Sequence, residues 1–222
     1  MKKIASIAIL AGIVACGGES ETGLKPTIEK TYETTLTKEV LHRENGDPFI
    51  KISVEQTPIL DTLHPNITTA NMALMTYSEL DEEERTNIPE IDIEFKKSGQ
   101  LTQSFTYEVP FMKGVYEKAK VFDQLSFALL NRQFELLDQR RNTEAVKQGI
   151  APLLEQKIEV LEEKYGPLQG YETFGLAEVG GQSGRAYQFQ AFLNFGEQKI
   201  PYFFYLDTRE EEDQWLGFSI QN

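Results

Sequence analysis

Apolar and polar residues alternate over the last third of the chain, and this pattern predicts a meander of antiparallel strands. Apolar side chains occupy every second position from Tyr187 to Phe195, with glutamine or asparagine at most positions between them, as in a strand with one buried face. The segment 200–206 is apolar almost throughout, so we expect it to be central or covered on both faces. Segments 171–179 and 215–220 supply the first and last strands.

Two helical segments precede these strands. The first starts at Tyr116 and continues beyond Asn131 through a kink or a short second helix. The second is capped by Thr143 and ends at Gly166, and it must absorb Pro152 as a kink or as a first-turn residue. The positions that share a buried face are Ala119, Phe122, Leu125, Ser126 and Leu129 in the first segment, and Ile150, Leu154, Ile158, Leu161 and Tyr165 in the second.

The amino-terminal half, 28–113, has the pattern of a smaller α+β unit, and Gly114 marks its end. Strands are predicted over 32–41 and 49–54 on either side of an Asn-Gly turn, and alternation recurs over 91–95 and 105–109.

Between these strand pairs we expect a loop over 56–66 and then a helix that begins at Thr68 or Thr69. Its apolar face consists of Ala70, Ala73, Leu74, Tyr77 and Leu80. The acidic run 81–84 either ends this helix, against its dipole, or begins a new turn after Leu80.

The first sixteen residues carry a motif of a known type. A short positive segment, Met1-Lys2-Lys3, precedes an apolar run over 4–14, which is too short to span a bilayer. The run ends in Ile13-Val14-Ala15-Cys16, which resembles the lipobox of bacterial lipoproteins. We therefore predict a signal peptide over 1–15 and a flexible, polar tether over 16–27.

The lipobox resemblance implies cleavage before Cys16 and attachment of diacylglycerol, and usually a further acyl chain such as palmitate, to that residue. Cys16 is the only cysteine in the sequence, which fits an acylated rather than a disulfide-bonded residue. The residue that follows is Gly17 and not aspartate, so the resemblance favours the outer membrane. We expect a lipoprotein facing the periplasm or the cell surface.

The order helix, helix, strand meander resembles the nuclear-transport-factor-like, or cystatin-like, superfamily. The residues that carry the resemblance are Lys164-Tyr165-Gly166-Pro167-Leu168, the strands over 187–195 and 200–206, and Gln214-Trp215-Leu216-Gly217-Phe218. The resemblance implies that 114–222 forms a curved antiparallel sheet packed on helices, a cone with a pocket at its wide end. The predicted fold class is α+β, and no convincing repeat relates the two halves.

The composition of the chain narrows the range of functions that we expect. The chain has 222 residues, 40% of them apolar, and a formal charge of −13, so we expect a folded core and no nucleic-acid partner. The mature chain offers only His42, His64 and an acylated cysteine as soft metal ligands, and we predict no metal site and no cofactor. Ser183 lies in a sequence close to a nucleophile elbow but without its final glycine, so we interpret it as a turn residue.

Enzymes of the resembled superfamily abstract protons with a pocket carboxylate and a hydrogen-bonding tyrosine. The pocket residues that the resemblance suggests here are Tyr171, Arg185, Tyr187, Gln188, Gln190, Tyr202 and Tyr205. No long strand carries an acid midway along its length, so we name no catalytic residue. The simpler interpretation is that these aromatic residues fill the core.

The function we expect is non-enzymatic: a membrane-anchored lipoprotein that binds a partner protein or a small ligand at the cell envelope. The alternatives are a pocket enzyme of isomerase or dehydratase type and a structural subunit of an envelope assembly that uses the 32–41 strand edge. An enzyme requires a buried acid facing a tyrosine, and a ligand binder requires an open cavity of about 300 Å³ or more. A scaffold requires a filled cone and an apolar surface patch.

Overall fold

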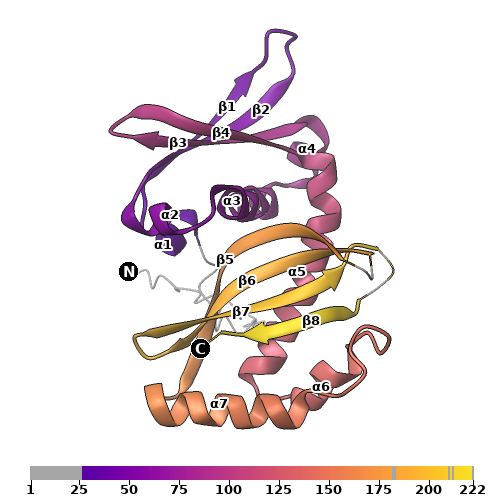
Figure 1. Ribbon diagram of the computed structural model, residues 1–222. Coiled ribbons are helices and arrows are strands. Elements are labelled where there is room, and N and C mark those ends of the chain that lie inside the picture. The colour runs from indigo at the N-terminus through magenta and orange to yellow at the C-terminus, as the bar shows by residue number, and fades with distance from the viewer. Residues whose placement is uncertain (1–26, 182–183, 210, 212, 222) are drawn as a thin grey trace, which may run out of the picture.

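The computed structural model describes residues 27–221 except 182–183, 210 and 212, and it confirms an α+β fold with two four-stranded sheets (Figure 1). Sheet A contains β1 (Leu36–His42), β2 (Pro48–Glu55), β3 (Glu90–Lys97) and β4 (Gln100–Glu108), in that spatial order. Sheet B contains β5 (Leu168–Gly181), β6 (Gly184–Phe195), β7 (Gln198–Asp207) and β8 (Trp215–Ile220). The helices are α1 (Ile28–Tyr32), α2 (Pro58–Thr62), α3 (Pro65–Glu79), α4 (Glu82–Asn87), α5 (Val109–Leu130), α6 (Phe134–Gln139) and α7 (Ala151–Tyr165).

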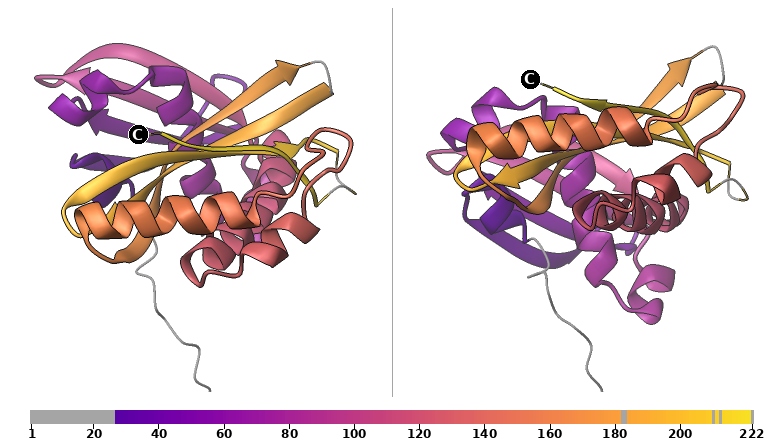
Figure 2. Two further views of the ribbon diagram at one scale, coloured as in Figure 1. Left: turned by 60° about the horizontal axis from the view of Figure 1, so that its bottom comes forward. Right: turned by 90° about the horizontal axis from the view of Figure 1, so that it is seen from below.

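The molecule is layered. From top to bottom in Figure 1 lie sheet A, α3, sheet B and α7, and α5 runs alongside these layers from the level of sheet A down to α6. The rotated views show α7 lying along sheet B near α5 and α6 (Figure 2). Buried side chains from both halves form one core cluster.

Sheet A joins two hairpins through a parallel pair, β2 with β3. A parallel pair needs a long crossover, and α2, α3 and α4 supply it. The register sets Ile50 beside Ile91 and Ile52 beside Ile93, and all four are buried. The alternate positions carry charge, and Lys51 pairs with Glu94 at 2.9 Å on the opposite face.

Helix α3 is enclosed between the sheets: from Thr68 to Tyr77 none of its residues is exposed. Three of its buried residues are threonines, and enclosure leaves their hydroxyls without water. Each hydroxyl donates to the carbonyl four residues earlier, at 3.1 Å for Thr68, 2.8 Å for Thr69 and 2.9 Å for Thr76. These bonds satisfy polar groups that would otherwise be buried without a partner.

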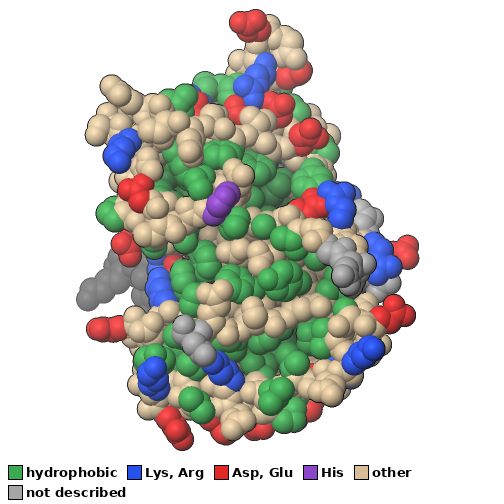
Figure 3. All heavy atoms as spheres, viewed as in Figure 1, with side chains coloured by type: hydrophobic (Ala, Val, Ile, Leu, Met, Phe, Trp, Pro, Cys, Tyr) green, Lys and Arg blue, Asp and Glu red, His purple; other side chains and the backbone are tan. Residues whose placement is uncertain are grey.

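Sheet B is a fully antiparallel meander, and α5 packs on one of its faces through Phe122. The Phe122 ring stacks on Phe189 and Tyr202, with centroids 5.2 and 6.0 Å apart. On the other face the side chains are half-buried, and Figure 3 shows hydrophobic groups between polar ones over this part of the molecule.

Irregular pairing in β5 lets α3 come close. The register with β6 shifts between Thr173 and Gly175, so residues before and after the shift face different neighbours. A Cβ at Gly175 would lie 2.6 Å from the Ile67 side chain of α3. Glycine at this position therefore allows the helix to pack against the strand.

Several sequence predictions are confirmed. The Asn-Gly turn joins β1 to β2, with Gly46 at φ +93°. The acidic run begins a new helix, in which Asp81 forms a capping box with Glu84. Pro152 lies in the first turn of α7, and Gly166 ends that helix at φ +94°. The segment 200–206 is central, because β7 pairs on both sides.

Five predicted boundaries were wrong. Tyr32 belongs to α1 and not to the first strand, and 56–66 holds α2 and the start of α3 instead of a loop. Prolines in the first turns of α2 and α3 explain the error over 56–66, since proline is common in loops but is also favoured at helix starts. Thr68 and Thr69 accordingly lie inside α3 and do not cap it.

The break predicted at Gly114 is also wrong, because Gly114 lies within α5, which starts at Val109. Packing of the neighbouring apolar positions outweighs the helix penalty of a single glycine, about 1 kcal/mol. The boundary expected between 113 and 114 therefore falls inside a continuous helix. Thr143 does not cap α7, which begins at Ala151; Asn142 accepts bonds from the backbone of Glu144 and Ala145 instead.

We predict that Phe122→Ala lowers the free energy of unfolding by about 3–5 kcal/mol, because it empties a fully enclosed aromatic site. The matched control is Phe127→Ala on the same helix. Phe127 is 58% exposed and Phe122 is 1% exposed, so the control should cost less than about 1 kcal/mol. Urea unfolding of both variants checks the prediction, and equal losses would contradict it.

Candidate functional site

The hollow with the most functional promise lies between α3, α5 and the start of β5, and its volume is about 690 Å³. This volume is within the range of small-molecule sites. Its walls combine apolar and aromatic groups with several polar side chains. The lining residues are Asn71, Leu74, Met75, Ser78, Tyr116, Ala119, Phe122, Asp123, Phe127, Leu130, Asn131, Leu168, Gln169, Gly170, Tyr171, Thr173 and Phe189.

A carboxylate and a phenol meet in this hollow: the Tyr171 hydroxyl donates to Asp123 Oδ1 at 2.8 Å. Tyr171 pairs with Leu193 of β6 and lies on the face of sheet B that meets α5. Asp123 follows Phe122, whose ring contacts that of Tyr171 edge to face, with centroids 6.0 Å apart. The buried phenylalanine thus sets the helix rotation that aims the carboxylate at the tyrosine.

Burial in the hollow governs the protonation of this pair. Loss of hydration raises the pKa of the Asp123 carboxyl above its ordinary value, and the hydrogen bond from Tyr171 offsets part of the rise. Burial, and then the nearby Asp123 charge, raise the pKa of the Tyr171 phenol. Tyr171 therefore stays protonated as a donor. Solvent still reaches Asp123 at the open side of the hollow, so the carboxylate is accessible to a ligand.

The buried polar groups Tyr202 and Asn71, close to the pair, already have partners. Tyr202 is fully buried beneath the hollow, and its hydroxyl donates to Ser126 Oγ at 2.8 Å. Asn71 Nδ2 donates to the Tyr32 hydroxyl at 2.8 Å, and that hydroxyl donates to the Phe174 carbonyl at 3.0 Å. These bonds tie α1, α3 and β5 together and make the site's wall rigid.

The structure does not bring the seven predicted pocket residues together. Tyr171 lines the hollow, and Tyr202 is packed in the core under it. Tyr187 is buried and contacts Phe111 edge to face, with centroids 6.4 Å apart. Exposed Arg185 forms an ion pair with Glu178.

The remaining three predicted residues lie on the opposite face of sheet B. Gln188 Nε2 donates to the Tyr205 hydroxyl at 2.7 Å, and Gln190 Nε2 donates to Gln188 Oε1 at 2.8 Å. They form a polar ladder across β6 and β7 and share no cavity with Tyr171. Successive side chains of a strand point to opposite faces of the sheet. Residues at odd and even positions of the same strand therefore cannot line one pocket.

Asp123 is the residue that sequence reasoning missed. The sequence prediction considered acids along the strands, whereas Asp123 comes from a helix that packs on them. A signal exists: Tyr116, Ala119, Asp123, Phe127 and Leu130 recur at helical spacing beside the core stripe. A second apolar stripe with one acid at its centre is consistent with a helix that faces a hollow.

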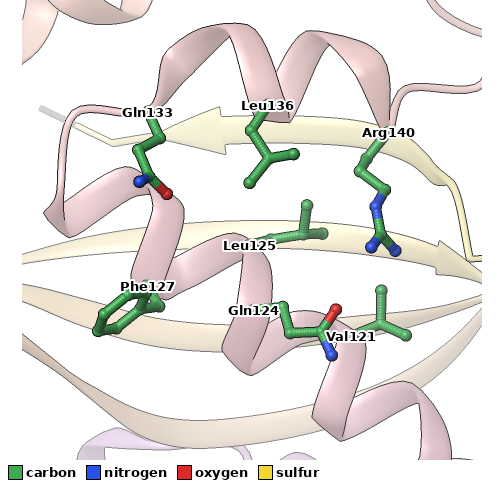
Figure 4. A pocket seen from close by; sticks show the side chains of 7 residues that line it. All are labelled: Val121, Gln124, Leu125, Phe127, Gln133, Leu136 and Arg140. Carbon is green, nitrogen blue, oxygen red and sulfur yellow. The ribbon is translucent and has the colours of Figure 1, made fainter.

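A smaller hollow of about 210 Å³ lies between α5 and α6 (Figure 4). Leu125 and Leu136 point toward each other across it, and Arg140 and Gln133 lie on its α6 side. Its volume is below that of most ligand sites, and Arg140 is the one charged residue that lines it. We therefore place the candidate site in the larger hollow.

Other predicted features have simple placements. His42 and His64 are exposed, at the end of β1 and before α3, and no cluster of three or more metal-ligating side chains occurs among the residues described. Cys16 and Ser183 lie outside the described residues.

The comparisons add no family assignment. No model of a known protein family, no curated protein and no solved structure matches this chain.

We predict that Asp123→Asn stabilises the protein at neutral pH. A raised pKa in the folded state means that the folding contribution of Asp123 is fully present below its unfolded pKa, about 3.9. That contribution is lost as the pH rises through the folded pKa. Asparagine cannot ionise, and its amide oxygen can still accept from Tyr171. The gain at pH 7 should stay below about 1 kcal/mol because solvent screens the site, and it should shrink as the pH approaches about 4.

Asp207→Asn is the control with the opposite sign. Hydrogen bonds from Arg209 lower the pKa of Asp207, so its contribution is present above the unfolded pKa and lost as the pH falls through the folded pKa. This variant should be less stable at pH 7, with the deficit shrinking on acidification. Urea unfolding across this pH range measures both, and a destabilised Asp123→Asn at pH 7 would contradict the prediction.

Proposed function

We propose that this chain is a lipid-anchored protein of the bacterial envelope that binds a small molecule in the hollow between α3, α5 and β5. One observation carries the binding proposal: the hollow of about 690 Å³ combines apolar and aromatic walls with neutral polar side chains and one carboxylate–phenol pair. Binding sites typically combine such walls with few polar groups that orient the ligand. The volume of the hollow exceeds the roughly 300 Å³ that a ligand binder requires.

The anchoring proposal is supported by the sequence Ile13-Val14-Ala15-Cys16 after a short apolar run. Acylated Cys16 would hold the protein at the outer membrane, facing the periplasm or the cell surface, with 16–27 as the tether. Among the residues described, no helix has the length and apolar character to cross a membrane.

We further propose that the carboxy-terminal half is a cystatin-like unit. Two features support this: helices α5 and α7 precede an antiparallel meander of four strands, and α5 packs on one face of that sheet. In this interpretation the hollow lies at the edge of the cone, where β5 meets the amino-terminal half.

Cys16→Ser should move the protein from the membrane fraction to the soluble fraction, since acyl chains contribute about 0.8 kcal/mol per buried methylene. Ser20→Ala, in the same predicted tether, is the control and should leave the protein in membranes. Fractionation followed by immunoblotting reads the result. If Cys16→Ser stays with the membranes, the lipobox interpretation fails.

Ala119→Trp should abolish ligand binding, because Ala119 lines the hollow and an indole would fill it. Leu153→Trp on α7 is the control, since Leu153 is 68% exposed and lies outside the hollow. We would screen a collection of cationic, neutral and anionic fragments by thermal melting. A ligand at about 100 times its Kd stabilises by about 2.7 kcal/mol, a rise of roughly 5 °C or more in Tm for a chain of this size.

The expected result is at least one fragment that raises the Tm of the wild type and of Leu153→Trp but leaves Ala119→Trp unchanged. If no fragment acts, or if every active fragment acts equally on Ala119→Trp, the hollow is not the binding site.

A second candidate function is proton transfer of the isomerase or dehydratase type. The observation that favours it is the Asp123–Tyr171 pair, in which an acid faces a tyrosine and loss of hydration raises the pKa of that acid above its ordinary value. Asp123 would remove a proton from the carbon next to the substrate's carbonyl group and would return that proton to a different carbon of the same substrate. With a β,γ-unsaturated ketone as probe, conversion by the wild type and its loss in Asp123→Asn would favour this function; binding without conversion would favour the first.

A further inference from the structure

The lining of the larger hollow has an unusual charge balance. Asp123 is the one Asp, Glu, Lys, Arg or His side chain among the residues that line it. An anionic ligand would therefore meet a carboxylate and no counter-charge, and like charges at close range disfavour each other. A cationic ligand would meet one opposite charge and no like charge among the lining residues.

Asp123 also has unused capacity to accept hydrogen bonds. An ionised carboxylate has about four acceptor positions, and here Oδ1 receives the Tyr171 hydroxyl. Within the described part of the chain, no lysine, arginine or histidine pairs with Asp123. Asp123 is exposed at the open side of the hollow, so a ligand ammonium group can reach its free acceptor positions and would be attracted by the opposite charge.

Several aromatic residues share the lining of the hollow with the carboxylate. Tyr116, Phe122, Phe127, Tyr171 and Phe189 all contribute to the lining, and the faces of such rings attract cations. Tyr116 already does so: the Lys120 ammonium lies 4.6 Å and the Arg85 guanidinium 5.2 Å from its ring centroid.

These two cations do not fill the site. Neither Lys120 nor Arg85 lines the hollow, and Lys120 is paired with Glu117 at 2.8 Å. The hollow is therefore shaped for a cation that the described residues do not themselves supply.

We propose that the ligand of the hollow is an organic cation, an amine whose ammonium group lies against Asp123 and whose apolar body lies against Leu74, Met75 and Phe127. This proposal rests on the proposed ligand-binding function and specifies its chemistry. Asp123 is the specificity-determining residue, and Tyr171 positions its carboxylate. The apolar wall sets the affinity for the body of the ligand.

Three probes of similar shape test the proposal: phenethylammonium, phenethyl alcohol and phenylpropionate, titrated by calorimetry at neutral pH into the mature lipoprotein in a nonionic detergent. The cation should bind the wild type about tenfold more tightly than the alcohol, the effect of roughly one charge-assisted hydrogen bond. The anion should bind most weakly.

Asp123→Asn should bring the affinities of the cation and the alcohol to within about twofold of each other, since the attraction between charges is gone. Glu159→Gln is the matched control: it removes one negative charge from exposed α7, and the preference for the cation should survive. Ala119→Trp should weaken all three probes, which places them in the hollow.

The proposal is overturned if the alcohol or the anion binds the wild type as tightly as the cation does, a comparison that does not depend on whether any variant folds. It is also overturned if the preference persists in folded Asp123→Asn. If all three probes bind equally and Ala119→Trp abolishes their binding, the cation proposal is wrong but the binding function is supported. Failure of all three probes to bind would overturn the cation proposal, and the fragment screen would then decide the binding function separately.

Discussion

The enclosure of α3 between two sheets is the constraint on which the rest of the structure depends. Between Thr68 and Tyr77 no residue of α3 is exposed, so its polar side chains need partners within the protein. Threonine hydroxyls bond to the helix's own backbone, and Asn71 bonds to Tyr32. Gly175 removes the side chain that would block its approach to β5. Because α3 is held by both sheets, the two halves of the chain share one core.

The candidate site is a consequence of this packing. Phe122 anchors α5 against sheet B, and α3 forms the opposite wall. Three elements that meet at an angle leave a space that their side chains do not fill. Around it, Tyr202, Ser126 and Asn71 are already bonded within the protein, so Asp123 is the charged group in the lining with capacity for a ligand. This single carboxylate is the basis for the class of ligand proposed for the hollow.

Much of the fold could be predicted from local patterns. Alternation identified the strands of both sheets, and the Asn-Gly turn and Gly166 marked real boundaries because these residues adopt a backbone conformation that others avoid. Errors in the predicted boundaries arose at residue types that occur both inside helices and at their ends. Proline both breaks helices and starts them, and glycine at position 114 is tolerated inside α5 because its neighbours are buried.

The sequence by itself determined the fold class, most strands and helices, and the lipobox-like motif, because each depends on residues that are close together in the chain. Tertiary structure alone decided the parallel pairing of β2 with β3, the burial of α3 and the meeting of Asp123 with Tyr171 across 48 residues. Periodicity tells which face of an element is apolar, but not which other element covers it. A site built from α3, α5 and β5 therefore becomes visible only when their packing is known.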